Sequence, residues 1–356
     1  DLNAVAQELN AEPSPARYDI ADGKVVDGEV GVRLDPEAAS FVMESALPGE
    51  TVELPAEVVY PTMTAQELEA VLFRDVLSTT TTNVSGTSAR KGNVKLAGAA
   101  VNGTILNDGD IFDYNQVVGK RTTERGFGEA ATYVNGETVN TVGGGICQVS
   151  STIYLATLLA NLEIVERYNH RFYPGYITMG MDATVSWGGP EFRFKNNTGY
   201  PIRIDVSYAN SKLTVTMVGT KVDDTYVKMT YEQLSTTSYE TEYVNDPTLP
   251  YGTQKQKQNG YTGREVVSYR NVYKGDGTLI SSKMEAKSSY KSRNQIILVG
   301  TAGAPAPADP AGEPAGGGAD VPVLPPDSGG TAAQPDAEPA PPPTDSGIPG
   351  WLMPME

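Results

Sequence analysis

The chain has 356 residues, so several folded units are expected rather than one domain. Lys and Arg total 27 and Asp and Glu total 44, a formal net charge of −17. Such a surface repels phosphate backbones, which excludes a nucleic-acid partner. No run of about 18 apolar residues is present, so no membrane span is predicted. The chain begins with a helical pattern without a cap or a signal peptide, as expected for an ectodomain cut from a longer precursor.

The first 60 residues predict a small α+β unit. Apolar residues at helical spacing predict one helix near the start, and Pro36 suits the first position of a second helix. Alternation of apolar and polar residues predicts strands between and after these helices. The predicted helices cover residues 2–9 and 36–45, and the predicted strands cover 16–18, 24–26 and 51–59.

Residues 61–225 predict a mixed α/β domain. Thr64 and Glu67 have the spacing of a capping box at the start of a helix. Residues 209–211 predict a hairpin turn between two alternating strands. The predicted helices cover 66–73, 94–102 and 147–161, and the predicted strands cover 109–114, 163–168, 192–194, 202–208 and 213–217.

The C-terminal part divides into two regions. Residues 230–301 are rich in Tyr, Val, Thr and Ser with glycine turns, which predicts a β-rich module. Residues 302–356 hold eight acidic residues, no Lys or Arg, and 14 of the 25 prolines, which predicts a disordered tail. The fold class expected for the whole chain is therefore α+β and multidomain.

Cys147 is the only cysteine, so no intrachain disulfide can form and any sulfur chemistry is that of a free thiol. It lies at the predicted start of the helix 147–161. Unpaired backbone N–H groups and the positive end of the helix dipole lower a thiol pKa at this position. The same N–H groups can stabilise an oxyanion. Cys147 is therefore a candidate nucleophile.

Other residues around the start of this helix are candidates for substrate contact. The glycine run before Cys147, which includes Gly144 and Gly145, allows a tight turn and a close approach of substrate to the backbone. Side chains in the first turn have hydrogen-bond donors that could point toward a substrate. These side chains are Gln148, Ser150 and Ser151.

His170 is the only histidine and therefore the only imidazole that could take a proton from Cys147. It follows the predicted strand 163–168, which would return the chain toward the helix start. An orienting carboxylate would complete the site. Asp182 is the nearest candidate, followed by Glu166, and a backbone carbonyl is a further alternative.

Simpler interpretations also fit these residues. A single cysteine in a helix is often a small buried hydrophobe, and a single histidine is often structural. A glycine-rich turn before a helix can bind phosphate, but the spacing here matches neither common phosphate-binding motif. One cysteine and one histidine provide too few ligands for a zinc site, so neither a metal nor another cofactor is expected.

Several spaced segments resemble the VanW family in the same order along the chain. The resemblance covers roughly residues 74–220. The segments are FDYN at 112–115, VGKRT at 118–122, GGGICQVSSTIY at 143–154, ERYNH at 166–170, GMDATV at 180–185 and FRFKN at 192–196. Residues 1–60 resemble the peptidoglycan-binding domain often found before VanW domains. Residues 238–301 resemble a G-five module, in which Gly252, Gly260, Gly263, Gly277 and Gly300 fit the glycine pattern.

Some VanW proteins are understood to be L,D-transpeptidases. The resemblance implies that Cys147 is the nucleophile and His170 the base of an enzyme that joins two third stem residues of peptidoglycan. The orienting role of Asp182 is our hypothesis from its position in the sequence. Arg121 could bind a stem carboxylate through two parallel hydrogen bonds, but a solvated or ion-paired surface arginine is an equal alternative.

The expected partners are peptidoglycan stem peptides, a donor tetrapeptide and an acceptor amine, with glycan strands contacting the flanking modules. The expected location is the cell wall or the outer face of the membrane. Two other functions share the same residues. A cysteine peptidase would use water in place of the acceptor amine, and a wall-binding protein without catalysis would merely pack Cys147.

Overall fold

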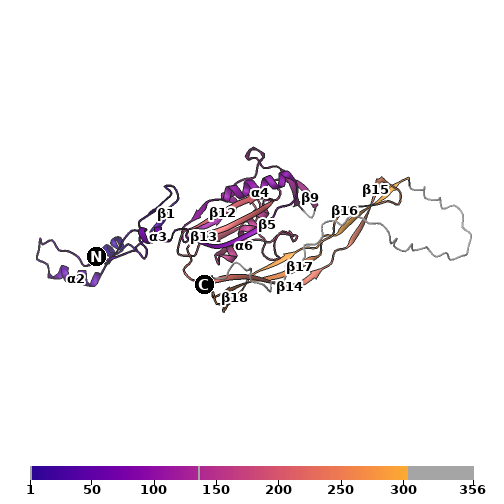
Figure 1. Cartoon of the computed structure of the whole chain (residues 1–356). Helices are drawn as coiled ribbons and strands as arrows, with labels where there is room; N and C mark the ends of the chain where they lie inside the picture. Colours follow the sequence, from indigo (N-terminus) through magenta and orange to yellow (C-terminus); the bar gives the residue numbers. More distant parts are fainter. Residues whose placement is uncertain (1, 135–136, 304–356) are drawn as a thin grey trace, which may run out of the picture. The chain divides into compact units, whose positions relative to one another are not determined.

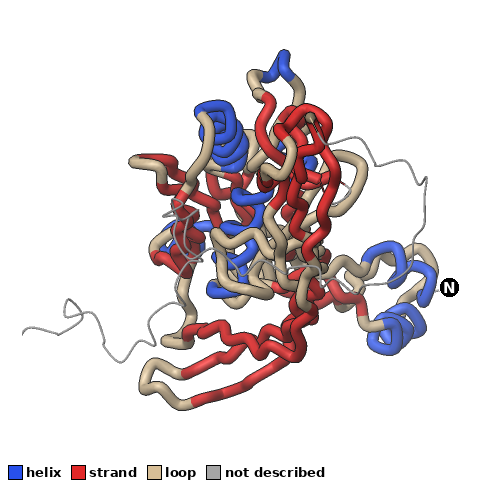
Figure 2. Tube along the Cα trace, turned by 90° about the vertical axis from the view of Figure 1, so that its right-hand side faces the viewer, coloured by secondary structure: helices blue, strands red, loops and turns tan. Residues whose placement is uncertain are grey.

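The computed structural model describes residues 2–134 and 137–303, and it confirms the α+β, multidomain fold class. The predicted disordered tail lies, from residue 304 onward, outside the described residues. Strands and loops make up most of the described chain (Figure 2). The described chain divides into two compact units, and residues 240–260 together with 294–303 form the smaller one. No helix in the described part of the chain is long and apolar enough to cross a membrane.

The N-terminal region of the first unit has its own small core, made by Ala6, Leu34 and Ala39. Asp35 caps the second helix by accepting hydrogen bonds from two backbone amides of the first turn. The predicted strand 51–59 is wrong in its first half, because only Ala56–Val59 pairs with another strand and Pro55 has no N–H for a ladder. The elements are α1 (Leu2–Leu9), β1 (Arg17–Asp19), β2 (Lys24–Val26), β3 (Gly31–Leu34), α2 (Pro36–Ser45) and β4 (Ala56–Val59).

A four-stranded antiparallel sheet is the centre of the first unit (Figure 1). Its strand order is β5 (Asp75–Asn83), β13 (Lys212–Gly219), β12 (Ile202–Ala209) and β6 (Thr104–Leu106). The hairpin predicted at 209–211 is confirmed: Asn210 and Ser211 both have positive φ, as a type I′ turn requires.

Two helices, α4 (Ser88–Val101) and α6 (Cys147–Leu159), pack on one face of this sheet. Ser78 of β5 donates its hydroxyl to the Ala156 carbonyl of α6. Gly98 of α4 lies so close to Val206 and Leu213 that a Cβ there would meet both side chains. Helix α6 is buried on almost all sides rather than on the one apolar face that its spacing predicts. Buried hydroxyl groups of α6 donate hydrogen bonds to backbone carbonyls one turn earlier in the helix, as the Thr152 hydroxyl does to the Gln148 carbonyl.

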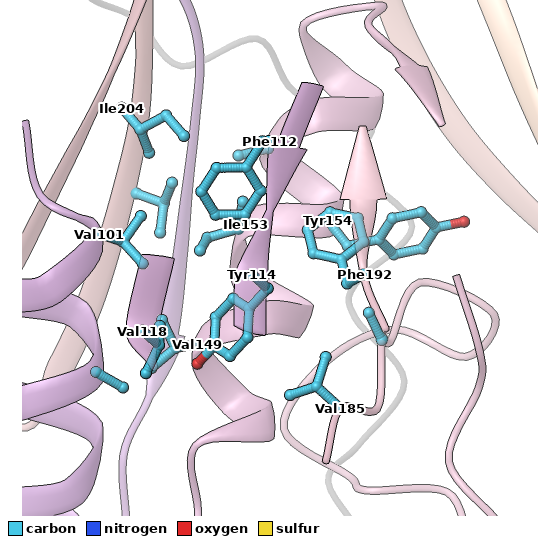
Figure 3. Close-up of a cluster of buried hydrophobic side chains, with 14 of the residues drawn as sticks. Val101, Phe112, Tyr114, Val118, Val149, Ile153, Tyr154, Val185, Phe192 and Ile204 are labelled. Atoms are coloured by element: carbon cyan, nitrogen blue, oxygen red, sulfur yellow. The ribbon is translucent and has the colours of Figure 1, made fainter. Parts of the chain in front are cut away.

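A second, three-stranded sheet packs aromatic residues against α6. Its order is β10 (Glu163–Glu166), β11 (Arg193–Lys195) and β7 (Ile111–Asp113). The rings of Phe112 and Phe194 stack with their centres 5.0 Å apart, and Phe192 lies edge-on to Tyr154 of α6. Figure 3 shows Phe112, Phe192 and Tyr154 close together in this core. This core fixes the position of α6 and therefore of Cys147 at its start.

Shorter elements complete the region. The capping box predicted at Thr64 and Glu67 is confirmed at the start of α3. Asp113 ends β7 and caps a short helix that the sequence analysis did not predict, α5. The remaining elements are α3 (Ala65–Val71), α5 (Tyr114–Val118), the 3-10 helix η1 (Thr123–Arg125) and the hairpin of β8 (Glu129–Val134) and β9 (Glu137–Val142).

The C-terminal strands divide between the two units. Strands β14 (Tyr226–Thr237), β17 (Gly263–Tyr273) and β18 (Leu279–Tyr290) form an antiparallel sheet in the first unit, where β14 contacts α6. In the second unit, β15 (Thr241–Pro250) pairs in parallel with β19 (Gln295–Ala302), and β16 (Gln254–Gln258) pairs antiparallel with β19.

Candidate active site

Cys147 is the first residue of α6, and its side chain is partly exposed. Its backbone N–H donates to no acceptor within the described part of the chain, and the residue before it provides no side-chain cap. The thiol lies 3.3 Å from the Val185 carbonyl oxygen and 3.9 Å from the Thr184 hydroxyl. The Cys147 thiol is therefore held at the positive end of a buried helix, next to an unused amide donor.

The turn before Cys147 depends on its three glycines. Gly143 and Gly145 have φ of +85° and +99°, which L-residues with a side chain rarely adopt. Gly144 has ordinary φ, but a Cβ there would lie 2.3 Å from the Ala130 carbonyl oxygen of β8. Asn93 of α4 donates its amide to the Gly144 carbonyl and holds the turn from the other side. The glycines thus let three elements meet at the start of α6.

Replacing Gly144 with alanine is expected to lower the free energy of unfolding by about 2 kcal/mol or more, because the new methyl group must displace backbone. Urea denaturation followed by circular dichroism measures the change. Gly92→Ala in α4 is the matched control, since nothing lies within 4 Å of its Cβ position. That substitution is expected to be neutral or stabilising by up to about 1 kcal/mol. Equal effects of the two substitutions would contradict the steric argument.

His170 and Asp182 form a close pair in the irregular segment between β10 and β11. The Asp182 Oδ2 atom accepts hydrogen bonds from the His170 ring Nδ1 and from the His170 backbone N–H, both at 2.7 Å. Asp182 is fully buried, whereas the His170 side chain keeps 17% of its surface exposed. The carboxylate therefore holds His170 by one ring bond and one backbone bond, and it leaves Nε2 directed away from it.

The thiol and the imidazole shift the pKa of each other. Burial favours the neutral thiol, but hydrogen bonding with His170 and its positive charge outweigh that effect and lower the pKa of Cys147. Burial likewise opposes the charge on His170, yet Asp182 and Cys147 together raise its pKa to about 9. Both shifts favour the thiolate–imidazolium form of the pair over the neutral form.

Tyr176 lies beside this pair, a position that the sequence analysis did not predict. Its hydroxyl lies 3.5 Å from the His170 Nε2 and 3.4 Å from the Ser151 hydroxyl, and its ring is edge-on to the imidazole. Burial raises the pKa of Tyr176 well above its usual value, so it stays a neutral donor. A single tyrosine in an irregular segment belongs to no sequence pattern that would indicate such a role.

Three of the residues considered for substrate contact are committed to internal hydrogen bonds. Gln148 is buried and bonds to Thr82, Asn83 and Arg90 around the end of β5. The Ser150 and Ser151 hydroxyls are buried and donate to the carbonyls of Cys147 and Ala183. These residues anchor the helix start and the segment after Asp182. Substrate contact by these residues stays a prediction.

Arg121 lies next to the glycine turn, where its side chain would meet a Cβ at Gly143. Its guanidinium lies 5.5 Å from the Tyr114 ring centre. All three guanidinium nitrogens are buried, and they make no hydrogen bond to any residue that the structure describes. A solvated surface arginine would instead expose these nitrogens to water. The geometry leaves its hydrogen-bonding capacity available to an anionic ligand.

Glu166, the second candidate for the orienting carboxylate, is instead paired with Arg193 at 3.1 Å. Arg193 also bonds to Asp113, so this ion pair ties β10, β11 and β7 together. Among the described residues, no group of three or more His, Cys, Asp or Glu side chains could hold a metal ion.

Comparison with known proteins bears on this site directly. The family model described as VanW like protein matches residues 89–218, which contain Cys147, His170 and Asp182. The uncharacterized protein YoaR of Bacillus subtilis is 35% identical over 203 residues, which cover 56% of this chain and 67% of YoaR. The chain belongs to the VanW-like protein family. The VanW-like segment thus includes α4, α6, most of the central sheet and the whole Cys–His–Asp arrangement.

A second family model and a second relative also match this chain. The G5 domain model matches residues 228–302, as the predicted G-five resemblance requires. The vancomycin B-type resistance protein VanW of Enterococcus faecalis is 28% identical over 126 residues, 34% of this chain and 46% of that protein. The chain therefore spans less than half of that relative and about two thirds of YoaR.

Two solved G5 domains are also similar to part of this chain. The G5 domain of an IgA1 protease is 21% identical with a TM-score of 0.16 and covers 23% of this chain and 96% of its own. HP0197-G5 is 22% identical with a TM-score of 0.13 and covers 22% of this chain and 100% of its own. Scores this low carry no argument about the fold. The G5 assignment rests on the family model.

Proposed function

We propose that this VanW-like protein is a cysteine-dependent L,D-transpeptidase of the bacterial cell wall. The observation that carries the proposal is the Cys147 thiol at the start of α6, with its pKa lowered by His170, which Asp182 orients. This is the arrangement by which cysteine acyltransferases generate a nucleophile. The cell wall as the place of action is supported by family membership and the G5 segment.

The first half-reaction forms a thioester. The Cys147 thiolate attacks the carbonyl carbon of the third stem residue, and the oxyanion forms next to the unused Cys147 N–H. The bond from that carbon to the nitrogen of the terminal D-Ala then breaks. The His170 imidazolium gives its proton to the leaving amine, and D-Ala departs.

The second half-reaction transfers the acyl group. A side-chain amine of a second stem attacks the thioester, and neutral His170 takes its proton. The carbon–sulfur bond breaks, Cys147 leaves as a thiolate, and an amide joins the two third residues. Arg121 is the candidate to bind a stem carboxylate, because its guanidinium has no hydrogen-bond partner among the described residues. The N-terminal region and the G5 segment are proposed to contact glycan strands.

The experiment that tests the proposal is incubation of the purified protein with disaccharide-tetrapeptides, followed by mass spectrometry. The expected product is a dimer that has lost one D-Ala, together with free D-Ala. Shortened monomers without dimers would instead indicate a cysteine peptidase, which shares the acyl-enzyme. Neither product, combined with slow alkylation of Cys147 by iodoacetamide, would indicate a wall-binding protein with a packed cysteine.

A further inference from the structure

Asp182 is bonded through both of its carboxylate oxygens. Oδ2 accepts the two bonds from His170. Oδ1 accepts a bond of 3.1 Å from the Arg167 guanidinium and one of 2.5 Å from the Tyr290 hydroxyl. The carboxylate is fully buried, so no water competes for these positions. One oxygen therefore holds His170, and the other holds Asp182 itself in place.

The two groups on Oδ1 are themselves fixed by strand β18. Arg167 also donates to the Ser288 hydroxyl at 2.9 Å, and the Tyr290 hydroxyl accepts the Gly180 backbone N–H at 2.8 Å. Ser288 and Tyr290 are two positions apart on β18, so both side chains point to the same face of their sheet. Both are buried. The two side chains on this face of β18 thus support Asp182, Tyr290 directly and Ser288 through Arg167.

Strand β18 lies outside the VanW-like segment. That segment ends at residue 218, whereas Ser288 and Tyr290 fall in the G5-matched residues 228–302. Strand β18 nevertheless belongs to the same compact unit as Cys147, His170 and Asp182. Further bonds join β18 and its neighbour β17 to the VanW-like segment: Asn169 donates to the Ser289 carbonyl of β18, and Arg270 of β17 donates to the Leu162 carbonyl.

We propose that strand β18 of the G5-matched segment is part of the catalytic site, with Tyr290 as a positioning residue that holds Asp182 and through it His170. The inference rests on the proposed function for its catalytic meaning. A phenylalanine would fill the same space, so packing alone does not require the hydroxyl. The Tyr290 hydroxyl instead donates to the Asp182 carboxylate and accepts from the Gly180 backbone N–H in the same loop. These two bonds give Tyr290 a positioning role.

The test compares Tyr290→Phe with Tyr173→Phe. The Tyr173 ring packs edge-on against Tyr290, but its hydroxyl donates to the Ile177 carbonyl and not to Asp182. In Tyr290→Phe, kcat is expected to fall about tenfold with KM nearly unchanged, and alkylation of Cys147 by iodoacetamide at pH 7 is expected to slow by several-fold. The pKa of His170, read by NMR from the only imidazole in the chain, is expected to fall. Tyr173→Phe is expected to change none of these values.

The proposal is overturned if Tyr290→Phe alkylates and titrates as the wild type does, even where its melting temperature is lower. If Tyr290→Phe does not fold, Ser288→Ala, which removes an acceptor of Arg167, must show a smaller change in the same direction. The alkylation and NMR readouts do not need substrate. A wild type that makes no cross-links, together with a Tyr290→Phe variant that still alkylates slowly, would therefore reject the proposed function and keep the positioning role.

Discussion

Replacing Cys147 with serine is expected to abolish cross-link formation, with a loss of at least about 1,000-fold in rate. A serine hydroxyl is far less acidic than a thiol, and the surroundings that lower the pKa of Cys147 do not ionise it. The dimer assay by mass spectrometry measures the loss. The oxygen occupies less space than the sulfur in a partly exposed position, so the melting temperature is expected to stay close to that of the wild type.

Glu166→Gln is the matched control for this experiment. It removes a carboxylate of β10 that pairs with Arg193 and contacts neither Cys147 nor His170, so full activity is expected. A Cys147→Ser variant that kept full cross-linking would refute the mechanism, because no other thiol exists in the chain.

Replacing His170 with glutamine is expected to slow thioester formation by roughly 10²–10⁴-fold. The thiol loses the partner that lowers its pKa, so less thiolate is present at pH 7. The leaving D-Ala also loses its proton donor. Single-turnover assays measure thioester formation, and iodoacetamide alkylation reports the thiolate separately. Unchanged alkylation at pH 7 in His170→Gln would contradict the thiolate–imidazolium pair.

The pH dependence of the wild type separates the two roles of His170. Its pKa in the fold is about 9, above the usual value near 6.5. Thioester formation is therefore expected to fall as the pH rises through about 9, where the imidazolium is lost. Alkylation of Cys147 is expected not to fall there, because the thiolate persists. A parallel fall of both rates would contradict this assignment.

The same shift affects stability. Protonated His170 stabilises the fold fully below about pH 6.5, and this contribution is lost as the pH rises through about 9. The melting temperature of the wild type relative to His170→Gln is therefore expected to fall over that interval.

Local signals in the sequence predicted most helix starts and the hairpin turn, but α4 begins at Ser88, six residues before the predicted start at residue 94. Thr64 and Glu67 cap their helix as the spacing predicted, and Asn210 and Ser211 form the predicted tight turn. Strand β5 was not predicted, because its run of serine and threonine residues has no apolar alternation. Its alternate side chains are nevertheless buried, and two of them bond to α6, Ser78 to the Ala156 carbonyl and Thr82 to the Thr152 hydroxyl. A strand whose buried side chains are polar shows no apolar–polar alternation in the sequence, so that pattern cannot predict it.

The proximity of Cys147, His170 and Asp182 was predictable, but the residues that support them were not. A single cysteine at a helix start and a single histidine leave few alternatives, and Asp182 was the nearest carboxylate downstream. Tyr290 lies 108 positions beyond Asp182 and in a different family segment, so no spacing rule connects them. The internal use of Gln148 could not be foreseen either, because it depends on where β5 ends beside α6.

The parallel pairing of β15 with β19 constrains the order in which the chain folds. Thr241 pairs with Gln295, which lies 54 positions later, and the two strands cannot meet until the chain between them has turned back. The antiparallel strands β17 and β18 lie in that interval and belong to the other unit. Closing a loop through folded structure costs less entropy than closing it through free chain. The smaller unit is thus expected to assemble last, after the hairpin that carries Tyr290 has formed.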